Sequence, residues 1–200
     1  MPPGAGPVGG PREGSVRKLF VGLFASLDGV VESPDQFVFP YFDDRVGAEV
    51  GAGIASTDTV VLGRVLYQQW AAYWPTKTKA DDGYADFING VRKVVVSTTL
   101  ESVDWQHAEL GGGDIEAAVR ALKEEDGGDI AVNGSITVAQ SLLKLGLVDE
   151  LRLLVFPVVV GSGRRLFDDL GRIPMRLVEA TPLPTGVLSL TYMPGEPLRP

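Results

Sequence analysis

Short apolar runs alternate with stretches of helical periodicity along most of the chain. Three of the runs, at 59–62, 94–96 and 130–132, are brief and rich in β-branched residues, which is typical of buried strands. Between them, apolar positions recur at steps of three and four residues, which predicts helices. Because strands that alternate with helices usually pair in parallel through crossover connections, the pattern predicts an α/β fold with a mostly parallel sheet.

The same spacing predicts the individual elements. Helices are expected at about 43–55, 65–74, 83–90 and 114–125 and from residue 136 onward. Further strands are expected at 17–25, 105–110 and 151–160, and the segments 175–180 and 187–192 predict a C-terminal antiparallel hairpin. Pro157 has no N–H to donate, so we expect a bulge or a break there. Gly161-Ser162-Gly163 then predicts a flexible loop.

Four aromatic residues in the predicted helix 65–74 recur at steps of three and four residues. They are Tyr67, Trp70, Tyr73 and Trp74. Such a stripe is more often core than binding surface, so we expect these side chains to pack inside the protein. The alternative is that Tyr73 or Trp74 stacks on the ring of a planar ligand.

Length and composition bound the domain organisation. The chain has 200 residues, of which 44% are hydrophobic and 22% charged, and this suits one globular domain. We expect that domain at 16–193. Residues 1–15 are rich in proline and glycine and predict a disordered tail, and residues 194–200 predict a loose C-terminal tail.

Charge and residue types exclude several classes of function. A net charge of −8 disfavours a nucleic-acid partner, because phosphate binding needs a basic face. The absence of cysteine excludes disulfides, thiol nucleophiles and thiolate metal sites. The single histidine, His107, makes neither a His-based zinc site nor a Ser-His-Asp triad by itself, so no metal is expected. Without a membrane span or an apolar signal core, we expect a cytoplasmic protein.

Small and polar residues follow each of the three buried strands. They are Gly63 and Arg64, then Ser97 and Thr98, then Gly134 and Ser135. Ligands of parallel sheets bind beyond the carboxyl ends of the strands, so we expect these residues to share a site. A pyrophosphate on the helix after Ser135, with a monophosphate between Arg64 and Ser97, would suit them. The usual G-x-G-x-x-G fingerprint is absent, and the alternative is that Asn133-Gly134-Ser135 is an ordinary turn and N-cap that binds nothing.

Three segments closely resemble the dihydrofolate reductase-like proteins of the RibD C-terminal domain family. They are DTVVLGRVLYQQW, KVVVST and IAVNGSITVAQSLLKLGLVDELRLLVFPVVVGSGRRLF. The resemblance runs from about Arg17 to Tyr192. It implies a three-layer α/β/α dihydrofolate reductase-like fold with a mixed, mostly parallel central sheet, and NADPH as the reductant.

The resemblance also implies roles for individual residues. Gly63 and Arg64 would flank the adenosine phosphates, and Ser97 and Thr98 would hold the 2′-phosphate. The pyrophosphate would be cradled by Gly134, Ser135, Ile136 and Thr137. Ala25 would lie by the nicotinamide. Asp28 belongs to the family's Ser-Leu-Asp-Gly motif beside the substrate cleft. Asp43 or Asp44 falls near the carboxylate that supports pteridine protonation in dihydrofolate reductases. Simple capping of the helix that follows explains these two aspartates at least as well.

The functional hypothesis is an NADPH-dependent reductase that transfers a hydride to a small heterocycle of pterin or aminopyrimidine type. The proton would come from Asp28, Asp43 or a bound water. The family also connects the chain with riboflavin biosynthesis and with 5-amino-6-(5-phosphoribosylamino)uracil reductase activity, and a homodimer is expected by analogy. The alternative is a nucleotide-binding or interaction module that keeps the fold without turnover.

Overall fold

The structure is a computed structural model and describes residues 17–196. Its strands are β1 (Leu19–Ser26), β2 (Thr57–Gly63), β3 (Arg92–Val96), β4 (Ala108–Leu110), β5 (Asp129–Asn133), β6 (Glu150–Phe156), β7 (Met175–Pro182) and β8 (Leu188–Pro194). Its helices are α1 (Asp44–Ile54), α2 (Arg64–Tyr73), α3 (Ala85–Gly90), α4 (Ile115–Glu124) and α5 (Ile136–Lys144), with short 3-10 turns η1 (Pro34–Gln36), η2 (Phe39–Tyr41) and η3 (Trp74–Thr76). Strands and helices alternate through most of the chain, as the apolar pattern predicts.

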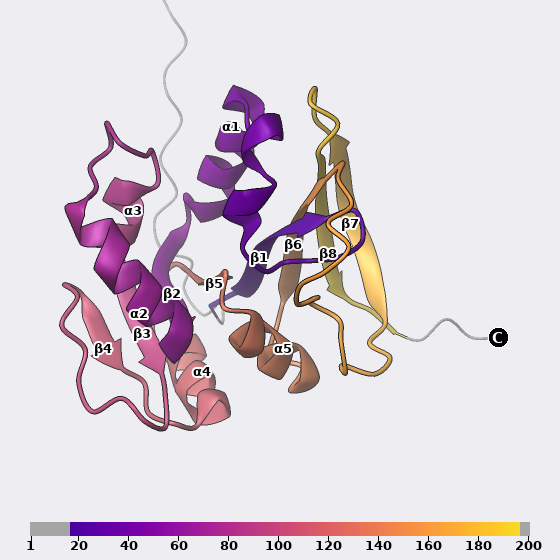
Figure 1. Ribbon diagram of the computed structural model, residues 1–200. Coiled ribbons are helices and arrows are strands. Elements are labelled where there is room, and N and C mark those ends of the chain that lie inside the picture. Colours follow the sequence, from indigo (N-terminus) through magenta and orange to yellow (C-terminus); the bar gives the residue numbers. More distant parts are fainter. Residues whose placement is uncertain (1–16, 197–200) are drawn as a thin grey trace, which may run out of the picture.

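The eight strands form one sheet in the order β4-β3-β2-β5-β1-β6-β8-β7. The neighbours from β4 to β6 pair in parallel, whereas β8 pairs with β6 and with β7 in the antiparallel sense. The hairpin β7–β8 ends one side of the sheet and β4 ends the other (Figure 1). β1 lies in the middle, between β5 and β6. The predicted mixed, mostly parallel sheet with a C-terminal hairpin is confirmed.

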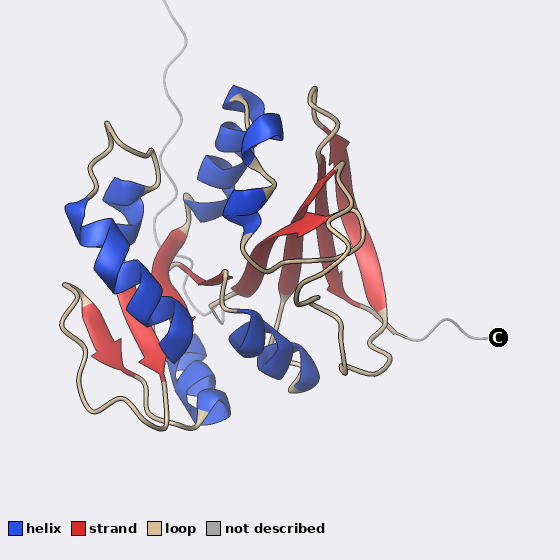
Figure 2. Cartoon of the chain, viewed as in Figure 1, coloured by secondary structure: helices blue, strands red, loops and turns tan. Residues whose placement is uncertain are grey.

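Helices cover both faces of the sheet (Figure 2), which gives the predicted three layers. Because successive side chains of a strand point to opposite faces, β1 contributes to both sides. Val21 packs with α4 and α5 on one face, and Phe20 packs with α2 and α3 on the other. α1 covers the second face farther along the sheet, where Val46 meets Phe156 of β6.

The predicted strand at 105–110 is wrong at its start. β4 begins only at Ala108, because residues 105–107 form a turn in which His107 has a φ of 59°. The turn lets the Trp105 side chain enter the core, where it is 5% exposed and lies 4.4 Å from the ammonium of Lys93. Trp105 is therefore a core residue that precedes the strand and is not part of it.

Other boundaries follow the sequence closely. β6 ends at Phe156, so the break expected at Pro157 is confirmed. β8 reaches Pro194, one residue into the range 194–200 that was expected to be a tail. The predicted tail at 1–15 lies outside the described residues.

The aromatic stripe of α2 and η3 is divided between core and surface. Tyr67 and Trp74 are buried, at 6% and 9% exposure, as the core interpretation predicts. Trp70 is half-buried, and Tyr73 is 51% exposed. The stripe therefore leaves part of its aromatic surface accessible.

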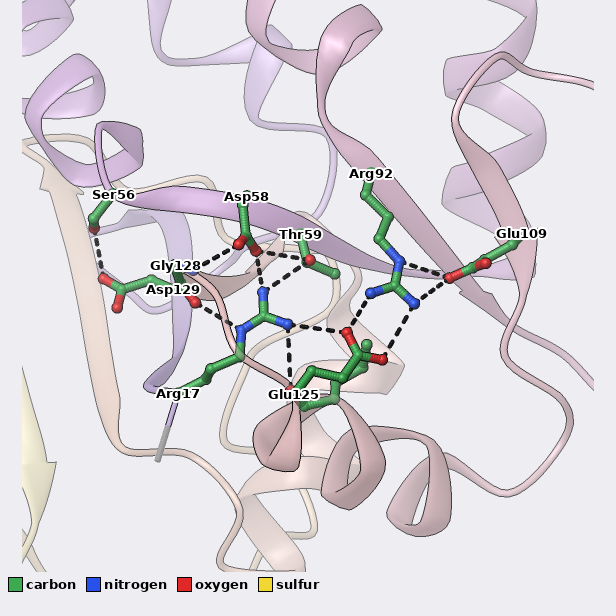
Figure 3. Close-up of polar contacts among 10 residues, drawn as sticks. Arg17, Ser56, Asp58, Thr59, Arg92, Glu109, Glu125, Gly128 and Asp129 are labelled. Atoms are coloured by element: carbon green, nitrogen blue, oxygen red, sulfur yellow. Dashed lines mark hydrogen bonds and ion pairs between the residues drawn. The ribbon is translucent and has the colours of Figure 1, made fainter. Parts of the chain in front are cut away.

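A polar network fastens the amino ends of the strands (Figure 3). The guanidinium of Arg17 is 2% exposed and pairs with the carboxylate of Asp58. It also donates to the hydroxyl of Thr59 at 2.9 Å and to the carbonyl oxygen of Gly128 at 2.8 Å. Glu125 extends the network by pairing with both Arg17 and a second arginine. These contacts join segments far apart in sequence, at the edge opposite the carboxyl ends of the strands.

Candidate functional site

The carboxyl ends of β2 and β5 lie beside each other, and each leads into a helix. β2 ends at Gly63, the N-cap of α2, and β5 ends at Asn133, just before the turn into α5. The N–H of Gly63 donates to the hydroxyl oxygen of Ser135 at 3.0 Å. Ser135 is 5% exposed and occupies the N-cap position of α5, as the turn interpretation expects, but its side chain makes no capping hydrogen bond. Its hydroxyl instead joins the starts of two helices.

α2 and α5 both begin without a side-chain cap. By contrast, Asp43 caps α1 by accepting from the N–H of Val46 at 2.9 Å, and Asp114 caps α4 by accepting from the N–H of Ala117 at 3.0 Å. The first-turn amides of α2 and α5 therefore keep their donors for another acceptor, at the positive ends of the helix dipoles. Such helix starts suit phosphate oxygens.

Two arginines stand beside these helix starts. Arg64 is the first residue of α2, and its guanidinium donates to the side chain of Gln68 at 3.3 Å. Arg164 comes from the loop after β6, and its Nη2 donates to Oγ1 of Thr137 in the first turn of α5 at 3.0 Å. Sequence analysis missed Arg164, because its partner lies 27 positions away. The adjacent arginines after the glycine-rich segment were the available signal.

Ser97 and Thr98 follow β3 at the same edge of the sheet. The N–H groups of Thr99 and Leu100 donate to the hydroxyl oxygen of Ser97, at 3.1 and 3.0 Å, so this hydroxyl shapes the turn. Thr98 is exposed. Both residues lie where the sequence placed them, and no hydrogen bond in the described part of the chain joins either to Arg64.

Asp28 fastens the loop after β6 to the end of β1. Its carboxylate accepts from the N–H groups of Val160 and Gly161, at 3.0 and 2.9 Å. The hydroxyl of Ser26 donates to it at 2.7 Å, and the guanidinium of Arg165 lies 3.3 Å from it. The loop that the sequence predicted to be flexible is therefore held at several points.

The same contacts set the ionisation of Asp28. Hydrogen bonds from the N–H of Val160 and the hydroxyl of Ser26 hold the pKa of the Asp28 carboxyl far below its usual range. The group is then ionised at neutral pH and holds no proton to donate. The N–H of Arg164 also donates to the carboxylate of Glu32 at 3.1 Å. Two acidic residues, Asp28 and Glu32, therefore hold the loop that carries Arg164 in place.

The other candidate acids lie at the start of α1. One oxygen of Asp43, Oδ1, accepts the capping bond from Val46, which favours the capping interpretation of this residue. Its second oxygen accepts no hydrogen bond in the described part of the chain. Asp44 is the exposed first residue of the helix.

Part of the sheet between α1 and α2 is left uncovered by helices. Gly22 and Phe24 lie on the central strand β1 and Asn133 ends its neighbour β5, yet all three are only half-buried. We call these three residues the uncovered strip. The two helices stand apart on this face (Figure 1). Ala25 points to the opposite face, where it is 5% exposed within the core.

Aromatic side chains border the uncovered strip on both sides. Trp70 and Tyr84 meet edge to face with 6.1 Å between ring centroids, and the Tyr84 hydroxyl accepts from Nδ2 of Asn133 at 3.2 Å. On the α1 side, Phe42 lies 6.1 Å from Phe24, also edge to face. The strip is therefore a partly exposed surface bordered by aromatic rings, and its Asn133 end lies near the paired helix starts.

A hollow of about 770 Å³ lies behind α2, lined in part by Gln68, Pro75 and Gln106. None of the predicted site residues lines it.

Within residues 17–196, no three histidine, cysteine, aspartate or glutamate side chains gather closely enough to hold a metal ion. Over the same range, no helix has the length and apolar character needed to cross a membrane.

Comparison with known proteins places this chain in a family. The model of the RibD C-terminal domain matches residues 17–189, and the chain belongs to that family. The uncharacterized protein YyaP of Bacillus subtilis strain 168 is 29% identical over 180 residues, which cover 88% of this chain and 94% of YyaP.

Solved structures share the fold at low sequence identity. A deaminase/5-amino-6-(5-phosphoribosylamino)uracil reductase from Thermotoga maritima matches with a TM-score of 0.65 and 16% identity, over 90% of this chain and 57% of that one. Dihydrofolate reductase from Enterococcus faecalis, complexed with NADP(H), matches with a TM-score of 0.63 and 12% identity, over 91% and 99% of the two chains. The fold is thus one that reductases use.

Proposed function

We propose that the protein is an NADPH-dependent reductase that transfers a hydride to a small heterocycle of pterin or aminopyrimidine type. The observation that carries the proposal is the contact between Ser135 and Gly63, which brings two uncapped helix starts together beside Arg64 and Arg164. Two sets of free amides with two guanidiniums fit the separated phosphates of a dinucleotide. Membership of a reductase family supports the same assignment.

In this proposal each side of the phosphate site has its own role. The amides of Ile136 and Thr137 and the guanidinium of Arg164 hold the pyrophosphate at the start of α5. Arg64, with Ser97 and Thr98, holds the 2′-phosphate that distinguishes NADPH from NADH. NADPH supplies the hydride, and the protein binds it, orients it and excludes water.

In this proposal the substrate ring lies on the uncovered strip, and groups of the protein determine which donor supplies the proton that the reduced ring takes up. Asp28 is ionised and its oxygens are occupied, so we assign it to positioning the Arg164 loop. We assign proton delivery to a water or to Asp43, whose second carboxylate oxygen accepts no hydrogen bond in the described part of the chain. In this proposal Asp28 positions the loop, and Asp43 or a water supplies the proton.

The test is oxidation of NADPH, followed by its absorbance, with a panel of dihydropterins and aminopyrimidines. The proposal predicts turnover with at least one ring and a lower rate with NADH. Tight NADPH binding without turnover of any ring would favour the alternative, a nucleotide-binding module. No response to NADPH would contradict both.

We also propose that the protein is a homodimer. β7 is an edge strand, and Leu177 and Val178 on it are each 49% exposed, so the strand presents apolar side chains as well as unpaired backbone groups. Light scattering should give twice the chain mass of 21.3 kDa, and a monomer at micromolar concentration would contradict the dimer. A cytoplasmic location and a role in riboflavin biosynthesis stay predictions.

A further inference from the structure

The amide of Asn133 is held so that one of its atoms is left for a ligand. Its Nδ2 donates to the hydroxyl of Tyr84, and burial raises the pKa of that phenol, which keeps the partner neutral. The amide oxygen, Oδ1, accepts no hydrogen bond in the described part of the chain. It lies above Gly22, where an added Cβ would approach it to 2.9 Å. The missing side chain of Gly22 thus makes room for the amide oxygen of Asn133 on this face of the sheet.

The side of α1 that borders the strip carries small and apolar residues. Glu49 contacts Ser189 of β8, which fixes the side of the helix that faces away from α2. The helical period then places Gly47 and Ile54 on the side toward α2. A Cβ added at Gly47 would meet only the ring of Phe42, at 3.8 Å. This wall offers space and apolar contact, and the charged groups at its start, Asp43 and Asp44, are negative.

The guanidinium of Arg152, which lies next to the strip, is already paired with other groups. The guanidinium of Arg152 lies 3.9 Å from the ring centroid of Phe20, next to Gly22 on the same face. It donates to the carboxylate of Glu150 at 2.7 Å and to the carbonyl oxygen of Gly53 at 2.8 Å. A phosphate or carboxylate arm laid along the strip would therefore meet Glu150 and a guanidinium that is already paired.

We propose that the strip takes an uncharged, amino-substituted planar ring without an anionic arm, and that Oδ1 of Asn133 accepts a hydrogen bond from a ring N–H or amino group. This inference rests on the proposed reductase function and adds the substrate class and the residue that reads it. It sets this chain apart from a reductase of phosphoribosyl-substituted uracil such as the T. maritima enzyme. Asn133 is a specificity-determining residue in this account, since a ring without a donor group at this point would cover the amide oxygen and leave it unpaired.

Two matched pairs of ligands test the substrate class, by thermal unfolding with saturating NADPH present. One pair is 5-amino-6-(5-phosphoribosylamino)uracil and its dephosphorylated form, and the other is dihydrofolate and dihydropterin. In each pair the uncharged member should bind about tenfold more tightly. Tighter binding of either charged member, or no binding of either uncharged ring, would overturn the inference.

Substitutions at the strip test the role of Asn133. Asn133→Leu should weaken binding of the uncharged ring about tenfold, whereas Asn133→Asp, which keeps an acceptor oxygen, should retain it. Gly22→Ala should weaken ring binding as Asn133→Leu does, because its Cβ displaces Oδ1. Gly90→Ala is the matched control, since an added Cβ there meets nothing within 4 Å. Equal loss in the Leu and Asp variants would show a structural role and overturn the assignment.

The affinity for NADPH separates this inference from the proposed function. It should stay within about twofold of the wild type in Asn133→Leu and Gly22→Ala. If the wild type binds uncharged rings but not NADPH, the reductase proposal fails and the ring site stands. If it binds NADPH but neither uncharged ring, the ring assignment fails and the cofactor site stands.

Discussion

The hydroxyl of Ser135 accepts a hydrogen bond from the backbone N–H of Gly63 at 3.0 Å, across 72 positions of sequence. The contact brings the starts of α2 and α5 together, and neither helix has a side-chain cap of its own. One buried hydroxyl therefore holds two sets of uncapped helix-start amides in a fixed relation. This relation is the structural basis of the proposed cofactor site.

Replacing Ser135 by alanine should lower both stability and cofactor affinity. The variant leaves the part-buried Gly63 N–H without its acceptor, which should cost about 1–2 kcal/mol, less than the full penalty for a buried donor. Urea unfolding measures the free energy, and calorimetry measures NADPH binding. Ser141→Ala, in the same helix, is the matched control and should change neither quantity by more than a few tenths of a kcal/mol. An unchanged Ser135→Ala protein would contradict the role of the hydroxyl.

The two arginines of the site should differ in what they recognise. Arg64→Ala should weaken NADPH binding about tenfold to a hundredfold and leave NADH binding nearly unchanged, because a charge-assisted hydrogen bond contributes about 1.5–3 kcal/mol. Arg164→Ala should weaken both cofactors alike, since both carry the pyrophosphate. Calorimetric titration of the two cofactors measures the ratio. The reverse pattern would exchange the two assignments.

The Asp28 anchor should make stability depend on pH. Its pKa is lower in the folded protein than in the unfolded chain, so the unfolded chain takes up a proton first as the pH falls. The stabilisation is complete above the ordinary pKa of 3.8 and is lost as the pH falls through the folded value. Asp28→Asn should therefore be less stable than the wild type at pH 7, by a margin that shrinks toward pH ~3. Urea unfolding at both pH values measures it, and a constant margin would count against the anchor.

The amino-edge network should matter for stability and not for the cofactor. Arg17→Met removes the guanidinium that serves Asp58, Thr59 and a backbone carbonyl oxygen. We expect a loss of about 2–4 kcal/mol, below the upper range for a buried pair because the Asp58 side chain is 47% exposed. NADPH affinity should be unchanged. Arg120→Ala, which breaks an exposed pair on α4, should cost less than about 0.5 kcal/mol. Similar losses in the two variants would contradict the importance of the network.

The sequence predicts the fold well where local pattern and burial agree. The runs at 59–62 and 130–132 are buried in the middle of the sheet, so their composition reports their position directly. The strand start at 105 is wrong because Trp105 is apolar for a tertiary reason, its contact with Lys93. A local pattern cannot separate a side chain buried by a turn from one buried by a strand.

The site is predictable in part for the same reason. Glycine and serine after β5 indicate a helix start that a ligand can approach. The contact between Arg164 and Thr137 depends on how the loop after β6 folds back, and that loop is anchored by Asp28 from 132 positions away. No spacing in the sequence encodes such a contact, and so Arg164 and the positioning role of Asp28 emerge only from the structure.

The most direct test of the account is thermal unfolding of the wild-type protein alone, with NADPH and with NADH. A ligand at a hundred times its Kd stabilises the native state by about 2.7 kcal/mol, which is a clear shift of the midpoint. We predict a large shift with NADPH and a much smaller one with NADH at the same concentration. The absence of a shift with both cofactors would mean that the helix starts joined by Ser135 do not form a dinucleotide site.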